Sequence, residues 1–122
     1  MKIQESAENY LETIFLCSKQ LKNVRSIDIV NALGFSKPSV STAMKNLRKE
    51  GYITVDTSGF IKLTPSGLRI AQKVYERHQL ITEFFTFLGV DEDVAKEDAC
   101  RMEHILSEES FEKLKIHFEK IK

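Results

Sequence analysis

The feature that most restricts the fold of this chain is a pair of short helical segments followed by a hairpin. Residues 26–34 (SIDIVNALG) and 36–51 (SKPSVSTAMKNLRKEG) are the two helical segments, and a very short turn separates them. Residues 52–64 then place apolar residues on both sides of the turn sequence DTSG, which is typical of a β-hairpin. This order of elements predicts a winged helix-turn-helix.

Capping residues indicate where the two segments begin and end. Ser26 is the candidate N-cap of the first segment, and Gly34 ends it. Ser36 is the candidate N-cap of the second segment, Pro38 lies in its first turn, where proline removes no helical hydrogen bond, and Gly51 ends it. The two segments are therefore predicted to be separate helices.

The outer face of the second segment has the chemistry of a DNA-recognition helix. Residues 37–50 hold four basic residues against the single acid Glu50. Basic side chains contact phosphates, small hydroxyls approach base edges, and the start of the first segment offers backbone amides to a phosphate. The residues predicted to contact DNA are Arg25, Ser26, Ser36, Lys37, Pro38, Ser39, Ser41, Thr42 and Lys45. The alternative is a solvated helix face beside a hairpin that serves a protein interface.

The remainder of the chain is predicted to be helical. Helices are expected over residues 6–21, 64–89, 91–107 and 107–122. Ser6 and Thr64 are candidate N-caps, and Pro65 takes the first position of its helix. The predicted fold is mainly α, with a winged helix-turn-helix DNA-binding domain over residues 1–64 and a C-terminal helical domain over residues 65–122.

A possible metal site lies in the sequence DACRMEH. Cys100, Glu103 and His104 stand at positions i, i+3 and i+4, so one arc of a helix carries a thiol, a carboxylate and an imidazole. Such a group binds transition metals, but three ligands from one helix do not saturate the ion, so other helices have to contribute. The six candidate ligands are Asn9, Glu12, His78, Cys100, Glu103 and His104. The alternative is a buried thiol, a core histidine and a solvated carboxylate with no common role.

The charge is unevenly distributed along the chain. The net charge is zero, which argues against a simple polybasic nucleic-acid binder, but residues 1–50 hold 8 basic residues against 5 acidic ones. Residues 91–109 hold eight acids against two bases, so one half is suited to an anion and the other to a cation. No apolar run reaches membrane-span length, the N-terminus shows no signal peptide, and two cysteines do not form a disulfide framework. We therefore expect a cytoplasmic protein.

In combination, these motifs resemble the DtxR/MntR family of metal-dependent transcriptional repressors. The matching stretches are ENYLETIF, RSIDIVNALGFSKPSVSTAMKNLRKEGYI, LTPSGLRIAQKVYERHQLITEFF, LGVD and EDACRMEH. The resemblance implies a homodimer that binds double-stranded operator DNA when a metal joins its two halves. It also implies that residues 65–122 form the helical metal-binding and dimerisation domain, with the six candidates at the family's ligand positions. The chain is similar to the short manganese-regulator form, without an SH3-like domain. The expected dimer surface comprises Phe84, Phe85, Phe87, Leu88, Leu106, Phe111 and Leu114.

The ligand types differ from both branches of that family. Asn9 stands where manganese-type members carry Asp and iron-type members carry Met, and Cys100 is the iron-type choice. Thiolate favours Fe(II), Co(II) or Zn(II) over Mn(II), whereas Glu12 and the short architecture favour manganese. We expect Fe(II) or Mn(II), with the balance towards iron, and Zn(II) or Co(II) as ligands in vitro. The secondary site of iron-type members looks incomplete, because Thr82 and Lys96 stand near it.

The functional hypothesis is a metal-activated repressor of Fe(II) or Mn(II) uptake genes that binds an inverted-repeat operator. We expect neither membrane association nor a small organic substrate. One alternative is a metal-independent or redox-responsive DNA-binding regulator that uses Cys100. Another is a small metalloenzyme, but the chain carries no phosphate loop, nucleophile elbow or HExxH motif, so we expect no enzyme.

Overall fold

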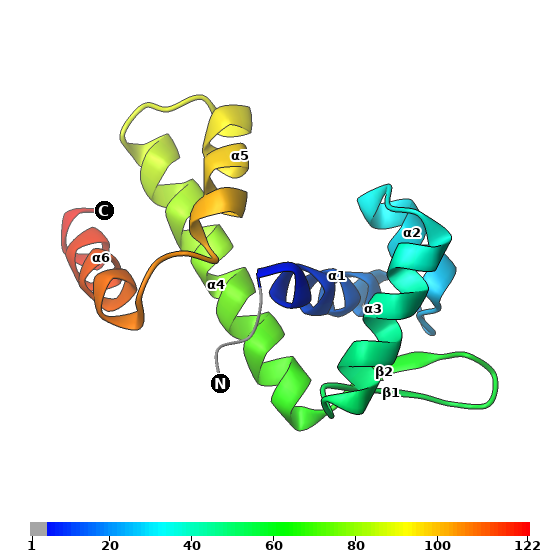
Figure 1. Cartoon of the computed structure of the whole chain (residues 1–122). Coiled ribbons are helices and arrows are strands. Elements are labelled where there is room, and N and C mark those ends of the chain that lie inside the picture. The colour runs from blue at the N-terminus through cyan, green and yellow to red at the C-terminus, as the bar shows by residue number, and fades with distance from the viewer. Residues whose placement is uncertain (1–4) are drawn as a thin grey trace. The chain divides into compact units, whose positions relative to one another are not determined.

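The structure is a computed structural model that describes residues 5–122. The first four residues, which belong to the predicted DNA-binding domain and to the stretch inspected for a signal peptide, lie outside this range. The elements are α1 (Glu5–Gln20), α2 (Ser26–Leu33), α3 (Lys37–Lys49), β1 (Ile53–Val55), β2 (Ile61–Leu63), α4 (Pro65–Phe87), α5 (Glu92–Met102) and α6 (Glu108–Ile121) (Figure 1). The predicted fold class, mainly α with an N-terminal winged helix-turn-helix and a helical C-terminal part, is confirmed.

The chain forms two compact units, Met1–Gln72 and Lys73–Lys122, and the division falls inside α4. The first unit has its own apolar core, in which Leu11, Ile29 and Val40 are fully buried. These residues come from α1, α2 and α3, so the three helices bury their apolar faces against one another, which is the main source of stability of such a unit. We call Met1–Gln72 the first unit and Lys73–Lys122 the second unit.

The hairpin closes the first unit. β1 and β2 pair antiparallel, with Val55 opposite Ile61, and an isolated bridge joins Val24 to Ile61. The Asp56 carboxylate accepts backbone N–H bonds from Ser58 and Phe60, at 2.9 Å each, and so holds the turn. The predicted hairpin around DTSG is confirmed.

Two of the predicted helix caps are wrong. α2 has Arg25 as its N-cap rather than Ser26, because the Asp28 carboxylate accepts a hydrogen bond from the Arg25 backbone N–H at 2.8 Å. Ser6 lies inside α1, which already begins at Glu5. The predicted cap Ser36 is confirmed, since its hydroxyl accepts from the Ser39 N–H at 3.3 Å.

Gly67, in the first turn of α4, lies unusually close to the backbone of residue 52. A Cβ atom at position 67 would lie 2.1 Å from the Tyr52 carbonyl oxygen. The predicted cap Thr64 is confirmed here, because its hydroxyl accepts from the Gly67 N–H at 3.2 Å and donates to the Gly51 carbonyl at 2.7 Å. The start of α4 is therefore fixed directly against the chain that enters the hairpin.

In the second unit, α6 packs against α4 through two buried phenylalanines. Phe111 and Phe118 are 5% and 1% exposed, and Phe118 stacks on Phe84 with ring centroids 4.8 Å apart. Three exposed ion pairs flank this contact: Lys73–Glu108, Glu76–Lys115 and Glu83–Lys122. Exposed pairs contribute little, so the aromatic contacts hold α6.

Candidate metal centre and nucleic-acid interface

Three of the predicted ligands meet in the second unit. One potential ligand atom from each of His78, Cys100 and Glu103 lies within 4.8 Å of the other two. His78 Nδ1 is 2.9 Å from Glu103 Oε2 and 3.8 Å from Cys100 Sγ. Although the residues come from α4, from the last turn of α5 and from its C-cap, one nitrogen, one sulfur and one oxygen converge on one point.

The Glu103 carboxylate lies between two imidazoles. Its second oxygen, Oε1, is 3.2 Å from Nε2 of His104, and the side chains of Glu103 and His104 are 1% and 4% exposed. A buried carboxylate is costly unless it has polar partners. His104, the fourth predicted ligand of this unit, is therefore next to the cluster because it contacts Glu103.

The helix that carries these residues is shorter than predicted. α5 ends at Met102 rather than continuing to residue 107, and Ser107 caps α6 by accepting from the Ser110 N–H at 3.1 Å. Glu103 keeps a helical backbone bond to Ala99 at 2.9 Å, so the spacing from Cys100 to Glu103 still follows one helical turn. His104 lies beyond the helix, and its approach to Glu103 is not a consequence of helical periodicity.

Asn9 and Glu12 belong to the first unit, where they lie one turn apart on α1. Glu12 is 7% exposed, and the Asn9 carbonyl accepts a hydrogen bond from the Thr13 hydroxyl at 2.8 Å. Their contribution to a centre that includes His78 is a proposal, developed below.

The donor set fits a divalent transition metal. Imidazole nitrogen with thiolate sulfur suits Fe(II), Co(II) or Zn(II), whereas Mg²⁺ and Ca²⁺ prefer sites made of oxygen atoms only.

Thr82 and Lys96 line a groove beside His78. The Thr82 hydroxyl donates to the His78 carbonyl at 2.7 Å, and the Lys96 ammonium pairs with Glu92 at 3.2 Å. Neither side chain is a carboxylate or imidazole, so the donor set remains that around Glu103.

Sequence reasoning missed Arg77, the residue before His78. Arg77 is only 6% exposed, and its guanidinium donates to the backbone carbonyls of Glu103 and Leu106. A polar stretch such as YERHQL gives no sign that one of its charges is buried.

The two cysteines are expected to differ in reactivity. Neither Cys17 nor Cys100 forms a disulfide, and Cys100 is the exposed one. Burial, assisted by the nearby Asp28 carboxylate, raises the pKa of the Cys17 thiol, which leaves less reactive thiolate at neutral pH.

Iodoacetamide should therefore modify Cys100 before Cys17. The modification rate of Cys17 should keep rising at pH values where the rate of an ordinary thiol no longer increases. Peptide mass spectrometry over a pH series measures both rates, with Cys17→Ser as the control; equal rates at neutral pH would contradict this.

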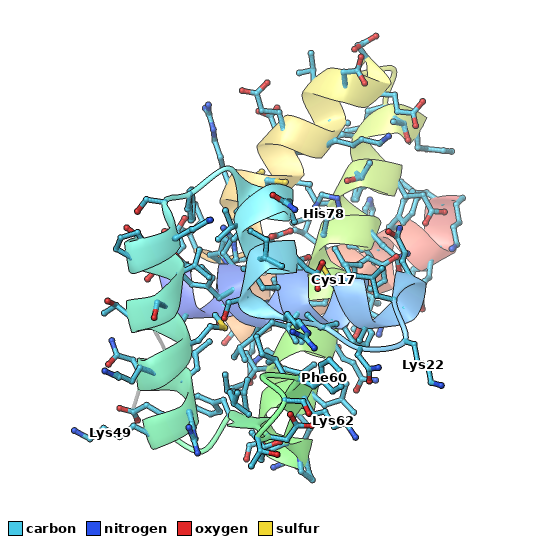
Figure 2. All side chains as sticks on the ribbon, turned by 90° about the vertical axis from the view of Figure 1, so that its right-hand side faces the viewer. Cys17, Lys22, Lys49, Phe60, Lys62 and His78 are labelled. Atoms are coloured by element: carbon cyan, nitrogen blue, oxygen red, sulfur yellow. The ribbon has the colours of Figure 1, made fainter. Side chains whose placement is uncertain are left out.

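The predicted DNA-contacting residues lie at the surface of the helix-turn-helix. All nine, from Arg25 to Lys45, are exposed, whereas Val40, Met44 and Leu47 on the opposite face of α3 are buried. Figure 2 shows the side chains of Lys49 and Lys22 extending away from the ribbon. The exposed face is polar and basic, as a surface that contacts phosphates requires.

Arg25 is oriented by the hairpin. Its guanidinium carbon lies 4.6 Å from the centre of the Phe60 ring, a cation–π contact. Residues 5–122 therefore contain both the cluster of His78, Cys100 and Glu103 and this basic face. No helix in residues 5–122 is both long and apolar enough to cross a membrane.

Known protein families match both parts of the chain. Residues 2–59 match the model of the iron dependent repressor N-terminal DNA binding domain, and residues 64–122 match that of the iron dependent repressor metal binding and dimerisation domain. The chain is 36% identical over 122 residues to an HTH-type transcriptional regulator of Methanocaldococcus jannaschii, covering 98% of each. It is 34% identical over 109 residues to the transcriptional regulator MntR of Salmonella typhimurium, covering 89% of this chain and 69% of that protein.

Solved structures show the same fold. The manganese regulator SloR matches with a TM-score of 0.81 and 28% identity, over 98% of this chain and 55% of SloR. A manganese-dependent transcriptional repressor in complex with manganese matches with a TM-score of 0.83 and 25% identity, over 91% of this chain and 51% of that one. The chain thus spans about half the length of these two proteins. Since both family models match and MntR is similar over most of its length, the chain belongs to the DtxR/MntR family and is a metal-dependent, DNA-binding transcriptional repressor of that type.

Proposed function

We propose that this repressor controls metal-ion uptake genes, with Fe(II) or Mn(II) as the activating ion and an inverted-repeat operator as its DNA site. The convergence of His78, Cys100 and Glu103 within 4.8 Å carries the proposal, because it supplies a transition-metal donor set in a chain that also has a winged helix-turn-helix. We further infer that the protein is cytoplasmic and has no catalytic activity, in keeping with relatives named as transcriptional regulators.

The proposed ligands come from both domains, residues 1–64 and residues 65–122. They are Asn9, Glu12, His78, Cys100, Glu103 and His104. A bound ion supplies bonds that hold these side chains together. An ion that binds more tightly to the DNA-competent arrangement shifts the protein towards that arrangement. Coupling of about 1–3 kcal/mol would change operator affinity roughly 5- to 150-fold.

The proposed DNA-binding form is a homodimer. Two recognition helices related by a two-fold axis read successive major grooves, so the operator should be an inverted repeat. Apolar residues on the second unit support a dimer surface: Phe87 and Leu88 are 52% and 62% exposed, and Phe84, Phe85 and Leu114 line an apolar groove. Phe111, which was expected on this surface, is instead buried in its own subunit.

Iron is favoured over manganese in this proposal by the Cys100 thiol, since thiolate is a soft ligand. The solved relatives include a repressor in complex with manganese and the protein ScaR with bound Zn²⁺. Glu12, the neutral Asn9 amide and the Cys100 thiol together define a site that Zn(II) and Co(II) would also enter in vitro.

Operator binding titrated with each metal tests the proposal. DNA would first be selected from a fragmented genomic library with metal-loaded protein. Its affinity would then be measured anaerobically with Fe(II), Mn(II), Zn(II) and a chelator. We expect tight binding only with a metal, and tighter binding with Fe(II) than with Mn(II) at equal concentration. Equal affinity in chelator would contradict metal activation, whereas a preference for Mn(II) would contradict only the choice of ion.

A redox-responsive regulator is the second candidate, because the Cys100 thiol is exposed and forms no disulfide. In that case peroxide, rather than chelation, would change DNA affinity. A Cys100→Ser variant that keeps its metal response but loses any response to peroxide would separate the two mechanisms.

A further inference from the structure

Arg77 is a buried cation that binds the main chain of a proposed metal ligand. It is 6% exposed, and its Nη1 donates to the carbonyl oxygens of Glu103 at 3.2 Å and Leu106 at 2.5 Å. Its Nε is buried and has no hydrogen-bond partner among residues 5–122. Burying a guanidinium is costly unless its contacts compensate, so these two carbonyl contacts must matter for the packing of this region.

Arg77 and His78 hold the same residue in two different ways. Arg77 binds the backbone carbonyl of Glu103, while His78 Nδ1 lies 2.9 Å from its side-chain oxygen Oε2. Glu103 is the C-cap of α5, and carbonyls at a helix C-terminus lack intrahelical partners. A cation there satisfies such carbonyls and interacts favourably with the helix dipole. Arg77 therefore fixes the backbone from which the carboxylate projects.

The same guanidinium also contacts α6. Its central carbon lies 5.2 Å from the centre of the Phe111 ring, and Leu106, whose carbonyl it binds, lies directly before the α6 cap Ser107. The planar guanidinium can bind carbonyls along its edge while its face packs on an aromatic ring, which a lysine ammonium cannot do. The end of α5 and the start of α6 therefore meet at Arg77.

We propose that Arg77 is a positioning residue for the metal centre: it holds the Glu103 carboxylate in place and links that position to α6. This inference rests on the proposed function, since it presumes that the Glu103 carboxylate binds the ion. Arg77 itself does not touch the metal. Loss of a residue that orients a ligand typically weakens metal binding about 10- to 100-fold.

The test is Co(II) binding by Arg77→Met and Arg77→Lys in the full chain, followed through the thiolate-to-cobalt charge-transfer band and the d–d bands. Arg101→Met and Arg101→Lys are matched controls, because Arg101 is exposed on the same helix as Cys100 and pairs with Glu97. We expect Arg77→Met to raise the Co(II) dissociation constant about 10- to 100-fold and to alter the d–d bands. Arg77→Lys should be intermediate, and both controls should match the wild type.

A double-mutant cycle separates positioning from general stability. In a Glu103→Gln background, Arg77→Met should change the Co(II) dissociation constant little further, since the carboxylate it orients is gone. An unchanged Co(II) dissociation constant in Arg77→Met would overturn the proposal. So would an equal rise of the dissociation constant on Arg77→Met in the wild-type and the Glu103→Gln backgrounds.

Two further outcomes are decisive. If Arg77→Met does not fold, the Co(II) dissociation constant of Arg77→Lys is compared with that of Arg101→Lys. A higher value for Arg77→Lys supports the proposal, and an equal value overturns it. A wild-type protein without a thiolate-to-cobalt band would contradict the metal centre itself, and so is distinct from a failure confined to Arg77.

Discussion

Replacement of Glu103 by alanine is expected to abolish metal-dependent operator binding. The carboxylate is 1% exposed and lies 2.9 Å from His78 Nδ1 and 3.2 Å from His104 Nε2. Its loss removes a proposed ligand and leaves two imidazoles without their shared partner, so metal affinity should fall by more than the roughly 10- to 100-fold that is typical of an outer-shell loss. At a metal concentration that saturates the wild type, the operator affinity of Glu103→Ala should be as low as that of the wild type in chelator.

The matched control is Glu97→Ala, which removes an exposed acid from the same helix. Calorimetry with Co(II) and fluorescence anisotropy with labelled operator would be run on both variants, after circular dichroism has shown that each is folded. Glu103→Gln, which keeps the shape of the side chain, separates loss of charge from loss of packing. A Glu103→Ala protein that binds the operator as the metal-loaded wild type does would remove Glu103 from the mechanism.

Gly67→Ala is expected to destabilise the first unit strongly, although alanine is the better helix former. In an open helix this change would gain about 1 kcal/mol. Here the new Cβ would lie 2.1 Å from the Tyr52 carbonyl oxygen and 3.0 Å from its carbon, which are backbone atoms that cannot rotate aside. Relieving such overlap costs roughly 1–3 kcal/mol, occasionally more, so the steric cost should exceed the gain in helix propensity.

Urea denaturation followed by far-ultraviolet circular dichroism measures the free energy of unfolding. Ser66→Ala, one residue earlier in the same helix, controls for propensity and should be neutral or slightly stabilising. A stabilised Gly67→Ala protein would mean that the close approach between α4 and residue 52 is not as described.

Local chemistry in the sequence was sufficient to predict the winged helix-turn-helix. The N-cap Ser36 and the turn around Asp56 act through hydrogen bonds to residues only a few positions away, and both are found as expected. The approach of Cys100 to Glu103 also follows from local spacing, because the two lie one helical turn apart. Such features depend on neighbours in the chain, which a sequence displays directly.

One error occurred where a distant residue contacts the end of a helix. Nothing near position 103 stops a helix, yet α5 ends at Met102, where Arg77 from another helix binds the carbonyls of Glu103 and Leu106. The cap of α2 was misplaced for a different reason. The Asp28 carboxylate reaches back to the Arg25 N–H, so the helix begins one residue after a side chain that is rarely an N-cap.

The attachment of α6 has a consequence for how this family member can vary. Phe111 and Phe118 lie seven positions apart, so both face α4 after two helical turns. Substitution of the exposed ion-pair residues beside them should be tolerated, because exposed pairs contribute little to stability. A single-residue insertion between the two phenylalanines would rotate the second by about 100° around the helix axis, so Phe118 would no longer stack on Phe84. We therefore expect α6 to tolerate substitutions that change its charge but not insertions or deletions that change its length.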